Sequence, residues 1–535
     1  MKKGVRLSQM AREDREPLVH LDHADLMRLP APLEDPAQDH HWAPLSAQAR
    51  ERYECGLDDT CAVNIPQPKT KAEEEELVKK FLAGLDKLFT RENNWTFLQP
   101  LLLTMEHCAR CQTCADACHV FEASGRNELY RPTFRSEILR RLYFKFVQRG
   151  GVLSAFQHGD IQVNWPLVAR LVELAYRCNL CRRCAQTCPM GADNGLVAHE
   201  LRKLFSQEMG IAAKELHEQG SMLQLKVGSS TGMNSVVVKD NLEFIDEDMS
   251  EKTGLEVHTP WDVEGADILL IHNAGEILAW PENPGAFAVV LNAAGLSWTL
   301  SSELAGYDSI NYGLWYDDAQ FARVAWKHLE AARKLKVKKI VLGECGHAHK
   351  ALSVVADRIL AGEMDIPRES ALTLLRDIVV NERIKLDPAR NNFPVTLHDP
   401  CNLVRLMGVV EPQREIVRKI CPQFREMEPH GVDNYCCGGG AGFAIMSGNN
   451  FPAWRFHVSG RKKLAQILTA FGDCLDPSIP KYLCAPCSNC KGQLRDLLAY
   501  YGLWERHRIL YGGLAELIVN AMADVQPGFL EWEWR

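Results

Sequence analysis

The sequence predicts a multidomain α+β protein in which a helical domain precedes two tandem α/β domains. Two runs of closely spaced cysteines lie between residues 108 and 188, with helical pattern around them. From Asp267 onward, short apolar strands alternate with helical segments, and the same order of elements occurs twice. Such alternation is typical of parallel sheets with crossover helices, and its recurrence indicates an internal duplication. A chain of 535 residues is long enough for each domain to bury its own core.

Residues 1–95 form a polar N-terminal arm that is rich in proline. Helical periodicity appears in it only from Lys71 to Phe89, where leucine and phenylalanine recur at helical intervals. We expect this arm to extend along the rest of the protein or along a partner. Cys55 and Cys61 lie within it, and their spacing matches no strong metal-ligand pattern, which favours thiols without a ligand role.

Two cysteine runs follow, each with the spacing C-x-x-C-x-x-C-x-x-x-C. In this pattern three thiolates of one loop bind one [4Fe-4S] cubane, while the fourth cysteine binds the other cubane. A zinc ribbon needs only two pairs of thiols, so eight cysteines in this register disfavour zinc. The first cubane is expected at Cys108, Cys111, Cys114 and Cys188. The second cubane is expected at Cys178, Cys181, Cys184 and Cys118.

This ferredoxin domain, residues 96–216, departs from the pattern of small bacterial ferredoxins in two ways. His119 follows Cys118 where proline is usual, so the turn at this point can differ. A long segment separates the two runs, and Ser136 to Gln148 and Trp165 to Tyr176 within it carry apolar stripes of helical period. The domain therefore resembles the α-helical ferredoxins of quinone-linked dehydrogenases, whose two cubanes relay single electrons.

Residues 217–265 lose periodicity and are expected to be a linker. The glycine-containing segment Gly228 to Gly232 lacks the lysine of a phosphate-binding loop, so we expect no nucleotide. The net charge of −8 argues against nucleic acid as a main partner. Apolar runs such as Ala286 to Leu296 are shorter than the roughly 20 residues of a membrane-spanning helix, so membrane association would require a partner subunit.

The two α/β domains are expected at residues 266–388 and 389–535. The expected strands are Ile268 to Ile271, Lys339 to Leu342, Val395 to Leu397 and Tyr482 to Leu483. The expected helices are Ala286 to Ala294, Ala319 to Lys334, Ala348 to Leu360, Gln413 to Ile420 and Gly460 to Phe471. Parallel strands with crossover helices place the loops after their carboxyl ends at one edge, where α/β proteins bind ligands.

Three cysteine-bearing loops of the last domain are candidates for a further metal centre. They contain His398 to Cys401, Cys436 to Gly440, and Cys484 to Cys490. The adjacent pair Cys436 and Cys437 suits an iron-sulfur assembly in which a thiolate is shared between irons, since neither a zinc tetrahedron nor an ordinary cubane needs such neighbours. Free cysteines can also be inert core residues, but three loops of closely spaced thiols disfavour that interpretation.

These cysteines resemble the CCG domain of heterodisulfide reductase catalytic subunits. With the ferredoxin motifs, the likeness is to the D-subunit type of those enzymes and, within it, to the DsrK type, the iron-sulfur subunit of the membrane complex linked to dissimilatory sulfite reductase. The resemblance implies a noncubane [4Fe-4S] cluster at which a disulfide-type substrate is split or made. The ligands that it implies are Cys401, Cys436, Cys437, Cys487 and Cys490, with Cys484 as a spare thiol.

The first α/β domain is expected to be a degenerate CCG-like copy. It has Cys345 after its second strand but no counterpart of Cys401 or of the adjacent cysteine pair. Cys345 is a candidate for contact with substrate, and a leftover core thiol is the alternative. His398 and Asp399 are candidates for tuning the cluster, with His398 as a proton donor, and a loop hydrogen-bond network is the alternative for both.

The resemblance implies an oxidoreductase subunit that acts on disulfide or trisulfide bonds. A DsrC-like small thiol protein would be the substrate, and an integral membrane b-type cytochrome or quinone-reactive subunit would exchange electrons through the two cubanes. Nineteen cysteines and the lack of an apolar leader after Met1 indicate a reducing compartment, so we expect the cytoplasmic face of the membrane. Two alternatives stay open: an iron-sulfur subunit of a flavin-dependent glycolate, glycerol 3-phosphate or lactate dehydrogenase, and a non-catalytic electron relay.

Overall fold

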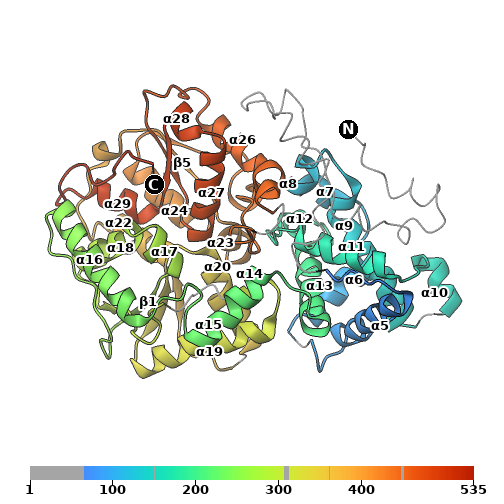
Figure 1. Ribbon diagram of the computed structural model, residues 1–535. Coiled ribbons are helices and arrows are strands. Elements are labelled where there is room, and N and C mark those ends of the chain that lie inside the picture. Colours follow the sequence, from blue (N-terminus) through green and yellow to red (C-terminus); the bar gives the residue numbers. More distant parts are fainter. Residues whose placement is uncertain are drawn as a thin grey trace. The chain divides into compact units, whose positions relative to one another are not determined.

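The computed structural model describes residues 65–94, 96–149, 151–306, 312–360, 362–447 and 451–534. The expected arm up to residue 64, with Cys55 and Cys61, therefore lies outside the described residues. Two compact units are present (Figure 1). Unit 1 contains the described residues up to Leu216, Trp315–Asp317 and Gly438–Ala465. Unit 2 contains His217–Leu314, Asp318–Cys437 and Gln466–Arg535.

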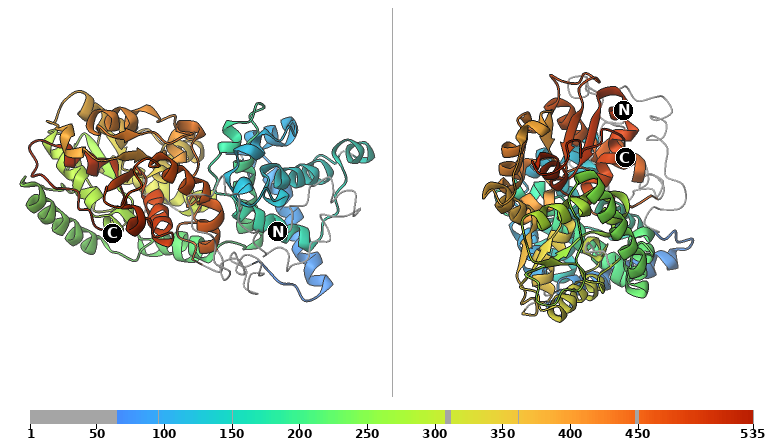
Figure 2. Two further views of the ribbon diagram at one scale, coloured as in Figure 1. Left: turned by 90° about the horizontal axis from the view of Figure 1, so that it is seen from above. Right: turned by 90° about the vertical axis from the view of Figure 1, so that its left-hand side faces the viewer.

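Unit 1 is helical and is built around α11 and α13. Asn164 caps α11 by accepting from the amide of Leu167, and the apolar stripe of this helix is buried. Helix α10 projects from its neighbours in Figures 1 and 2, and Phe156 on it is 90% exposed. The helices of this unit are α5 (Lys71–Leu88), α6 (Leu98–His107), α7 (Thr113–Ala117), α8 (His119–Ala123), α9 (Pro132–Leu142), α10 (Gly151–His158), α11 (Trp165–Tyr176), α12 (Arg183–Gln186), α13 (Asn194–Met209), α14 (Lys214–Leu216) and α25 (Phe451–Trp454).

Unit 2 contains two parallel sheets with the same strand order. In the first sheet the order is β2-β1-β3-β4, and in the second it is β6-β5-β7-β8. The strands are β1 (Ile268–Ile271), β2 (Trp298–Thr299), β3 (Lys339–Leu342), β4 (Arg368–Ser370), β5 (Val395–Leu397), β6 (Phe424–Arg425), β7 (Lys481–Cys484) and β8 (Ile509–Gly512). Every pairing is parallel, and β1, β5, β7 and β8 are buried along their whole length. The predicted α+β class with an internal duplication is therefore confirmed.

Helices cover both sheets of unit 2 and share one apolar core. Residues of α16, α18, α22, α24 and α29 join the strands in this core. The helices are α15 (Leu223–Val227), α16 (Ser235–Thr253), α17 (Ala274–Ala279), α18 (Glu282–Ala293), α19 (Asp318–Lys334), α20 (Gly346–His349), α21 (Ala356–Ile359), α22 (Ala371–Val380), α23 (Cys401–Leu406), α24 (Glu411–Ile420), α27 (Ser488–Tyr500), α28 (Leu503–His507) and α29 (Leu514–Ala521), while α26 (Arg461–Ala470) carries the chain from unit 1 into unit 2.

The segment 217–265 is not the irregular linker that loss of periodicity predicted. It contains α16, a helix of 19 residues capped by Asn234, whose side chain accepts from the amide of Val237. Its buried residues include Val238, Leu242 and Ile245, but Phe244 is 70% exposed. Exposed apolar residues on the outer face hid the helical period of the buried face.

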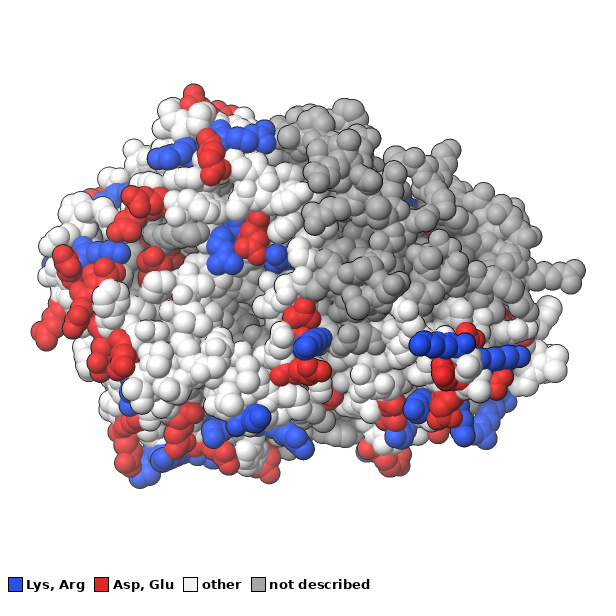
Figure 3. Space-filling view, in the orientation of Figure 1, with Lys and Arg blue, Asp and Glu red and all other residues white. Residues whose placement is uncertain are grey.

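Charges of both signs are mixed on the visible surface. In the face drawn in Figure 3, basic and acidic side chains of the described residues lie beside one another. Several form exposed ion pairs, such as Lys338 with Asp267 at 2.6 Å. Such pairs contribute little to stability, so the folded state depends on burial and on the internal polar contacts of each unit.

One internal polar network ties α13 to the segment after α5. The carboxylate of Glu200 is fully buried and accepts from Lys203 Nζ at 2.7 Å and from Asn94 Nδ2 at 2.7 Å. The Asn94 amide also donates to the carbonyl of Leu88 at 2.9 Å, which fixes the end of α5. Burial opposes ionisation, but Lys203 and His199 outweigh it and lower the pKa of Glu200 to about 2.

We expect Glu200→Gln to destabilise the protein by about 3–5 kcal/mol, because it leaves the Lys203 ammonium buried without its counter-charge. Since the folded-state pKa lies below the ordinary value of 4.5, the stabilisation is present above about pH 4.5 and is lost as pH falls toward 2. Urea unfolding between pH 7 and pH 3 measures both effects. Glu208→Gln on the same helix removes a part-exposed partner of Lys87 and should cost less than about 1 kcal/mol; equal losses in both variants would contradict the assignment.

Candidate metal centres

The two ferredoxin loops of unit 1 have the same backbone geometry. The first loop follows the end of α6 at His107, and the second follows α11 after one further residue, Arg177. In each loop the residues on both sides of the second cysteine have positive φ, namely Arg110 (57°), Gln112 (69°), Leu180 (51°) and Arg182 (60°). Left-handed backbone costs a residue with a side chain roughly 1–2 kcal/mol. Its occurrence at matching positions shows that both loops follow the same backbone path.

The eight thiols of these loops form two groups. Cys114 lies near Cys108, Cys111 and Cys188. Cys184 and Cys118 both lie near Cys178 and Cys181. Each group thus takes three cysteines from one loop and the fourth from the other. This arrangement could hold two [4Fe-4S] cubanes, and it suits neither a disulfide framework nor a single zinc site.

Burial and neighbouring thiols raise the pKa of three of these thiols, Cys114, Cys118 and Cys184. Burial, with help from neighbouring cysteines, raises the pKa of Cys114 to about 11. Burial raises the pKa of Cys118 to about 12. Iron must therefore displace protons from both groups when a cluster binds.

Hydrogen bonds to sulfur accompany both groups. Arg135 donates from Nη2 to Cys178 Sγ at 3.4 Å and to the carbonyl of Asn194 at 3.1 Å. The amide of Ala192 donates to Cys188 Sγ at 3.3 Å. Donors to ligand sulfurs stabilise the reduced, more negative state of an iron-sulfur cluster and so set its potential.

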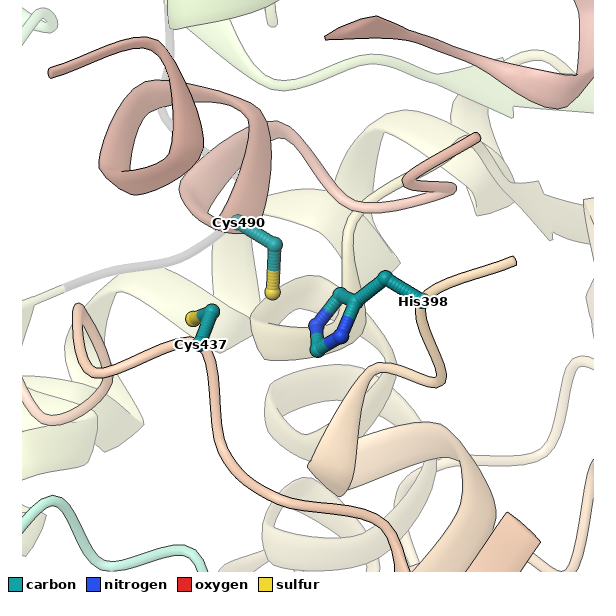
Figure 4. Close-up of side chains that lie close together, drawn as sticks. All are labelled: His398, Cys437 and Cys490. Atoms are coloured by element: carbon teal, nitrogen blue, oxygen red, sulfur yellow. The ribbon is translucent and has the colours of Figure 1, made fainter. Parts of the chain in front are cut away.

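In unit 2 a second kind of thiol cluster lies at the carboxyl ends of β5 and β7. Ligand atoms of His398, Cys437 and Cys490 all lie within 4.8 Å of one another, and all three residues are buried (Figure 4). Among the described residues this is the one group of three or more His, Cys or acidic ligand atoms that is so close. Cys437 is also within hydrogen-bonding range of Cys436, as Cys490 is of Cys487.

The thiols of this cluster have different proton affinities. Hydrogen bonds from Cys436 and Cys490, with the neighbouring His398, hold the pKa of Cys437 well below its usual range despite burial. Hydrogen bonds to Cys437 and Cys487 raise the pKa of Cys490 well above its usual range. These closely packed sulfurs could bind iron, because a metal cation would compensate the repulsion between their thiolates.

The remaining cysteines of the last domain occupy different surroundings. Cys401 is buried at the first residue of α23. Its neighbours Pro400 and Asn402 lie next to Gly346, where an added Cβ would be 3.3 Å from Pro400 Cβ and 3.5 Å from Cys487 Sγ. Cys484 is the last residue of β7 and is packed in the apolar core. Helix α27 begins at Ser488 and carries Cys490 in its first turn.

Asp399 is occupied by a structural ion pair. Arg414 binds both of its carboxylate oxygens, at 2.8 and 2.5 Å, and the amide of Gly431 donates at 2.6 Å. Burial opposes the charge, but these donors outweigh it and lower the pKa of Asp399. The Asp399 side chain therefore holds the loop, as the hydrogen-bond alternative predicted, while the His398 ring faces the thiols (Figure 4).

The first α/β domain brings its own residues to this cluster. Cys345 is within hydrogen-bonding range of Cys487, and so is His347. The amide of Gly346 donates to Cys487 Sγ at 3.3 Å. The sequence singled out Cys345 but missed His347, since a histidine after a strand carries no signal of its own.

The glycine-rich segment after Cys437 packs within unit 1. Gly438 has φ of 93°, and a Cβ there would lie 2.5 Å from the nitrogen of Gly460, so the position requires glycine. Asn179, which follows Cys178, donates to the carbonyl of Gly438 at 2.9 Å. Its side-chain oxygen lies 3.0 Å from Nε2 of His119, the residue that stands where proline is usual. Asn179 thus links the second ferredoxin group to the residue bonded to Cys437.

Comparisons with known families match both cysteine regions. Residues 104–192 match the 4Fe-4S dicluster domain. Residues 395–495 match the cysteine-rich domain known as CCG. No solved structure matches the chain.

Among characterised proteins, the chain is similar to iron-sulfur subunits of Hdr-like complexes. It is 25% identical to Hdr-like menaquinol oxidoreductase iron-sulfur subunit 2 of Archaeoglobus fulgidus, over 81% of both chains. It is 26% identical to the dihydromethanophenazine:CoB--CoM heterodisulfide reductase D-subunit of Methanosarcina acetivorans, over 64% of this chain and 79% of that protein. A probable membrane-anchored ferredoxin of Chromohalobacter salexigens is 23% identical over 80% of this chain and 61% of its own. These matches and the cysteine geometry identify an iron-sulfur protein similar to the subunits of Hdr-like oxidoreductases.

We expect Cys437→Ala, and equally Cys436→Ala, to lose the iron and acid-labile sulfide of one cluster while the EPR signals of two cubanes remain. Both thiols belong to the compact group of unit 2, which shares no cysteine with the ferredoxin loops. Cys484→Ala is the matched control, because it removes a buried thiol beside the same loops and should retain full iron. Iron loss from Cys484→Ala, with retention in Cys437→Ala, would reverse the assignment.

Proposed function

We propose that this protein is the iron-sulfur subunit, of the DsrK type, of a membrane-bound redox complex. It reduces or forms a disulfide or trisulfide at a noncubane [4Fe-4S] cluster held by Cys401, Cys436, Cys437, Cys487 and Cys490. The two cubanes at the ferredoxin loops exchange single electrons with the quinone pool through a membrane partner. The sulfur substrate is carried by a small DsrC-like thiol protein.

The observation that carries this proposal is the compact thiol group of unit 2. Cys436, Cys437, Cys487 and Cys490 are each at most 3% exposed and lie together at the carboxyl ends of parallel strands. An electron relay needs only the two ferredoxin groups. A further centre built from adjacent cysteines, in a region that matches the cysteine-rich domain, supports sulfur chemistry instead. The name of the Methanosarcina relative, a heterodisulfide reductase, supports the same substrate class.

Reduction of a disulfide R–S–S–R′ consumes two electrons and two protons and releases RSH and R′SH. A cluster held by these cysteines would supply an iron site for sulfur and would accept or deliver electrons singly. His398 can hold one proton on its ring beside Cys437, where a leaving thiolate would need it. The buried cysteines exclude bulk water from the same place.

Peripheral attachment through partner subunits fits the relatives' names. One relative is named a menaquinol oxidoreductase subunit, and another a membrane-anchored ferredoxin. Within the part of the chain that the structure describes, no helix is both long and apolar enough to cross a bilayer. We propose that this subunit meets the quinone pool only through its membrane partner, on the cytoplasmic side.

A thiol-binding experiment tests the proposed reaction. After oxidation in the presence of a small dithiol, we expect a new low-temperature EPR species in the wild type and in Cys484→Ala. Cys437→Ala should lack this species but keep the cubane signals. Disulfide reduction with reduced viologen as electron donor should fall at least about 100-fold in Cys437→Ala, since the variant loses the reacting centre. A spectrum unchanged by thiol would instead indicate a non-catalytic relay.

A further inference from the structure

Three groups of one turn in the first α/β domain meet the sulfur of Cys487. The Gly346 amide donates to this sulfur at 3.3 Å, and the side chains of Cys345 and His347 are both within hydrogen-bonding range of it. All of these residues are buried, with Cys345 and Cys487 each 1% exposed.

The side chain of His349 holds this turn in place. His349 contacts the carbonyl of Cys345 through Nδ1 at 2.7 Å and the Ser370 hydroxyl through Nε2 at 2.9 Å. Burial lowers the pKa of His349, so its ring is neutral, with Nδ1–H donating to the carbonyl and Nε2 accepting from the hydroxyl. This contact fixes the direction of the turn toward Cys487.

A second set of contacts clamps the turn onto the last domain. The Glu344 side chain accepts from the amides of Leu514 and Ala515 at the start of α29, at 2.9 and 2.8 Å. The Glu344 carbonyl accepts from the amide of Ser488 at 2.8 Å, next to Cys487. The Gly346 amide of the first domain donates to Cys487 of the last domain. Each domain therefore donates hydrogen bonds to the other at this point.

Cys345 is suited to donate a hydrogen bond and not to bind iron. Its side chain is 1% exposed and lies within hydrogen-bonding range of the Cys487 sulfur, so its S–H can donate to that sulfur. The first domain also lacks the further cysteines that would complete a donor set around it. A protonated thiol beside a thiolate gives an S–H···S hydrogen bond.

We propose that the turn Cys345–Gly346–His347 is a hydrogen-bonding cap on the Cys487 sulfur, by which the degenerate first domain raises the reduction potential of the cluster in the last domain. The inference rests on the proposed function in that Cys487 must be a cluster ligand. Donors to a ligand sulfur draw off its charge and stabilise the reduced cluster. The first domain thus acts by positioning and polarising a ligand, without touching substrate.

The test is an EPR-monitored redox titration of the cluster in the last domain. Cys345→Ala should retain the iron and sulfide of all clusters, and its midpoint potential should shift to a more negative value. We expect about a tenfold change in the reduced-to-oxidised ratio at fixed potential, which equals about 59 mV for a one-electron couple. Cys345→Ser keeps a donor and should restore most of the shift, and His347→Phe should shift the potential in the same direction.

Cys421→Ala is the matched control, because it removes another buried thiol of unit 2 that lies in the apolar core, and its midpoint should stay at the wild-type value. Loss of one cluster's iron from Cys345→Ala would make Cys345 a ligand and overturn the cap. An unchanged midpoint with full iron would overturn it as well. Failure of the proposed function is distinguishable, since the wild type would then contain only the iron of the two cubanes.

Discussion

The structure of this protein depends on the burial of sulfur atoms that would repel one another as thiolates. Cys436, Cys437, Cys487 and Cys490 are each at most 3% exposed, in a region where water cannot screen their charge. Without metal, a proton on one sulfur reduces the repulsion between the thiols. The pKa of Cys490 is raised between Cys437 and Cys487, whose own pKa values are lowered. Burying several thiolates together costs several kcal/mol of desolvation free energy for each charge unless a cation compensates them. The burial of these loops is therefore consistent with a site that binds iron.

The two α/β domains contribute different residues to the surroundings of this thiol group. Their sheets have the same strand order, and corresponding turns follow β3 and β7, with Cys345 placed after the first as Cys487 is after the second. The last domain supplies the compact group of Cys436, Cys437, Cys487 and Cys490. The first domain contains the single cysteine Cys345 and a Gly346 amide that donates to the sulfur of Cys487 at 3.3 Å. The thiol group therefore lies in one copy, and the other copy packs against it.

The grouping of the ferredoxin cysteines was predictable from their spacing, but the contacts that surround the thiols of the last domain were not. The C-x-x-C runs led to the same two groups of four cysteines that the structure brings together, because loop geometry is set by a few adjacent residues. The contact of His347 with Cys487 joins residues far apart in the chain and depends on how two sheets pack, which no local pattern encodes. Helix α16 was missed since its outer face carries exposed valines and Phe244. The two-residue strands β2 and β6 are too short to show a period.

The segment Gly438–Ala465 belongs to unit 1, although the residues before and after it belong to unit 2. This affects where the chain can be cut into separately expressed fragments. This segment leaves the last domain directly after Cys437 and finds its hydrogen-bonding partners among ferredoxin residues such as Asn179 and Arg202. A fragment starting at residue 389 would include all five cysteines that we propose as ligands and yet lack the residues of unit 1 with which the segment Gly438–Ala465 folds. Expression of the two halves as separate polypeptides is therefore expected to leave the segment that follows Cys437 without its hydrogen-bonding partners, which the undivided chain supplies.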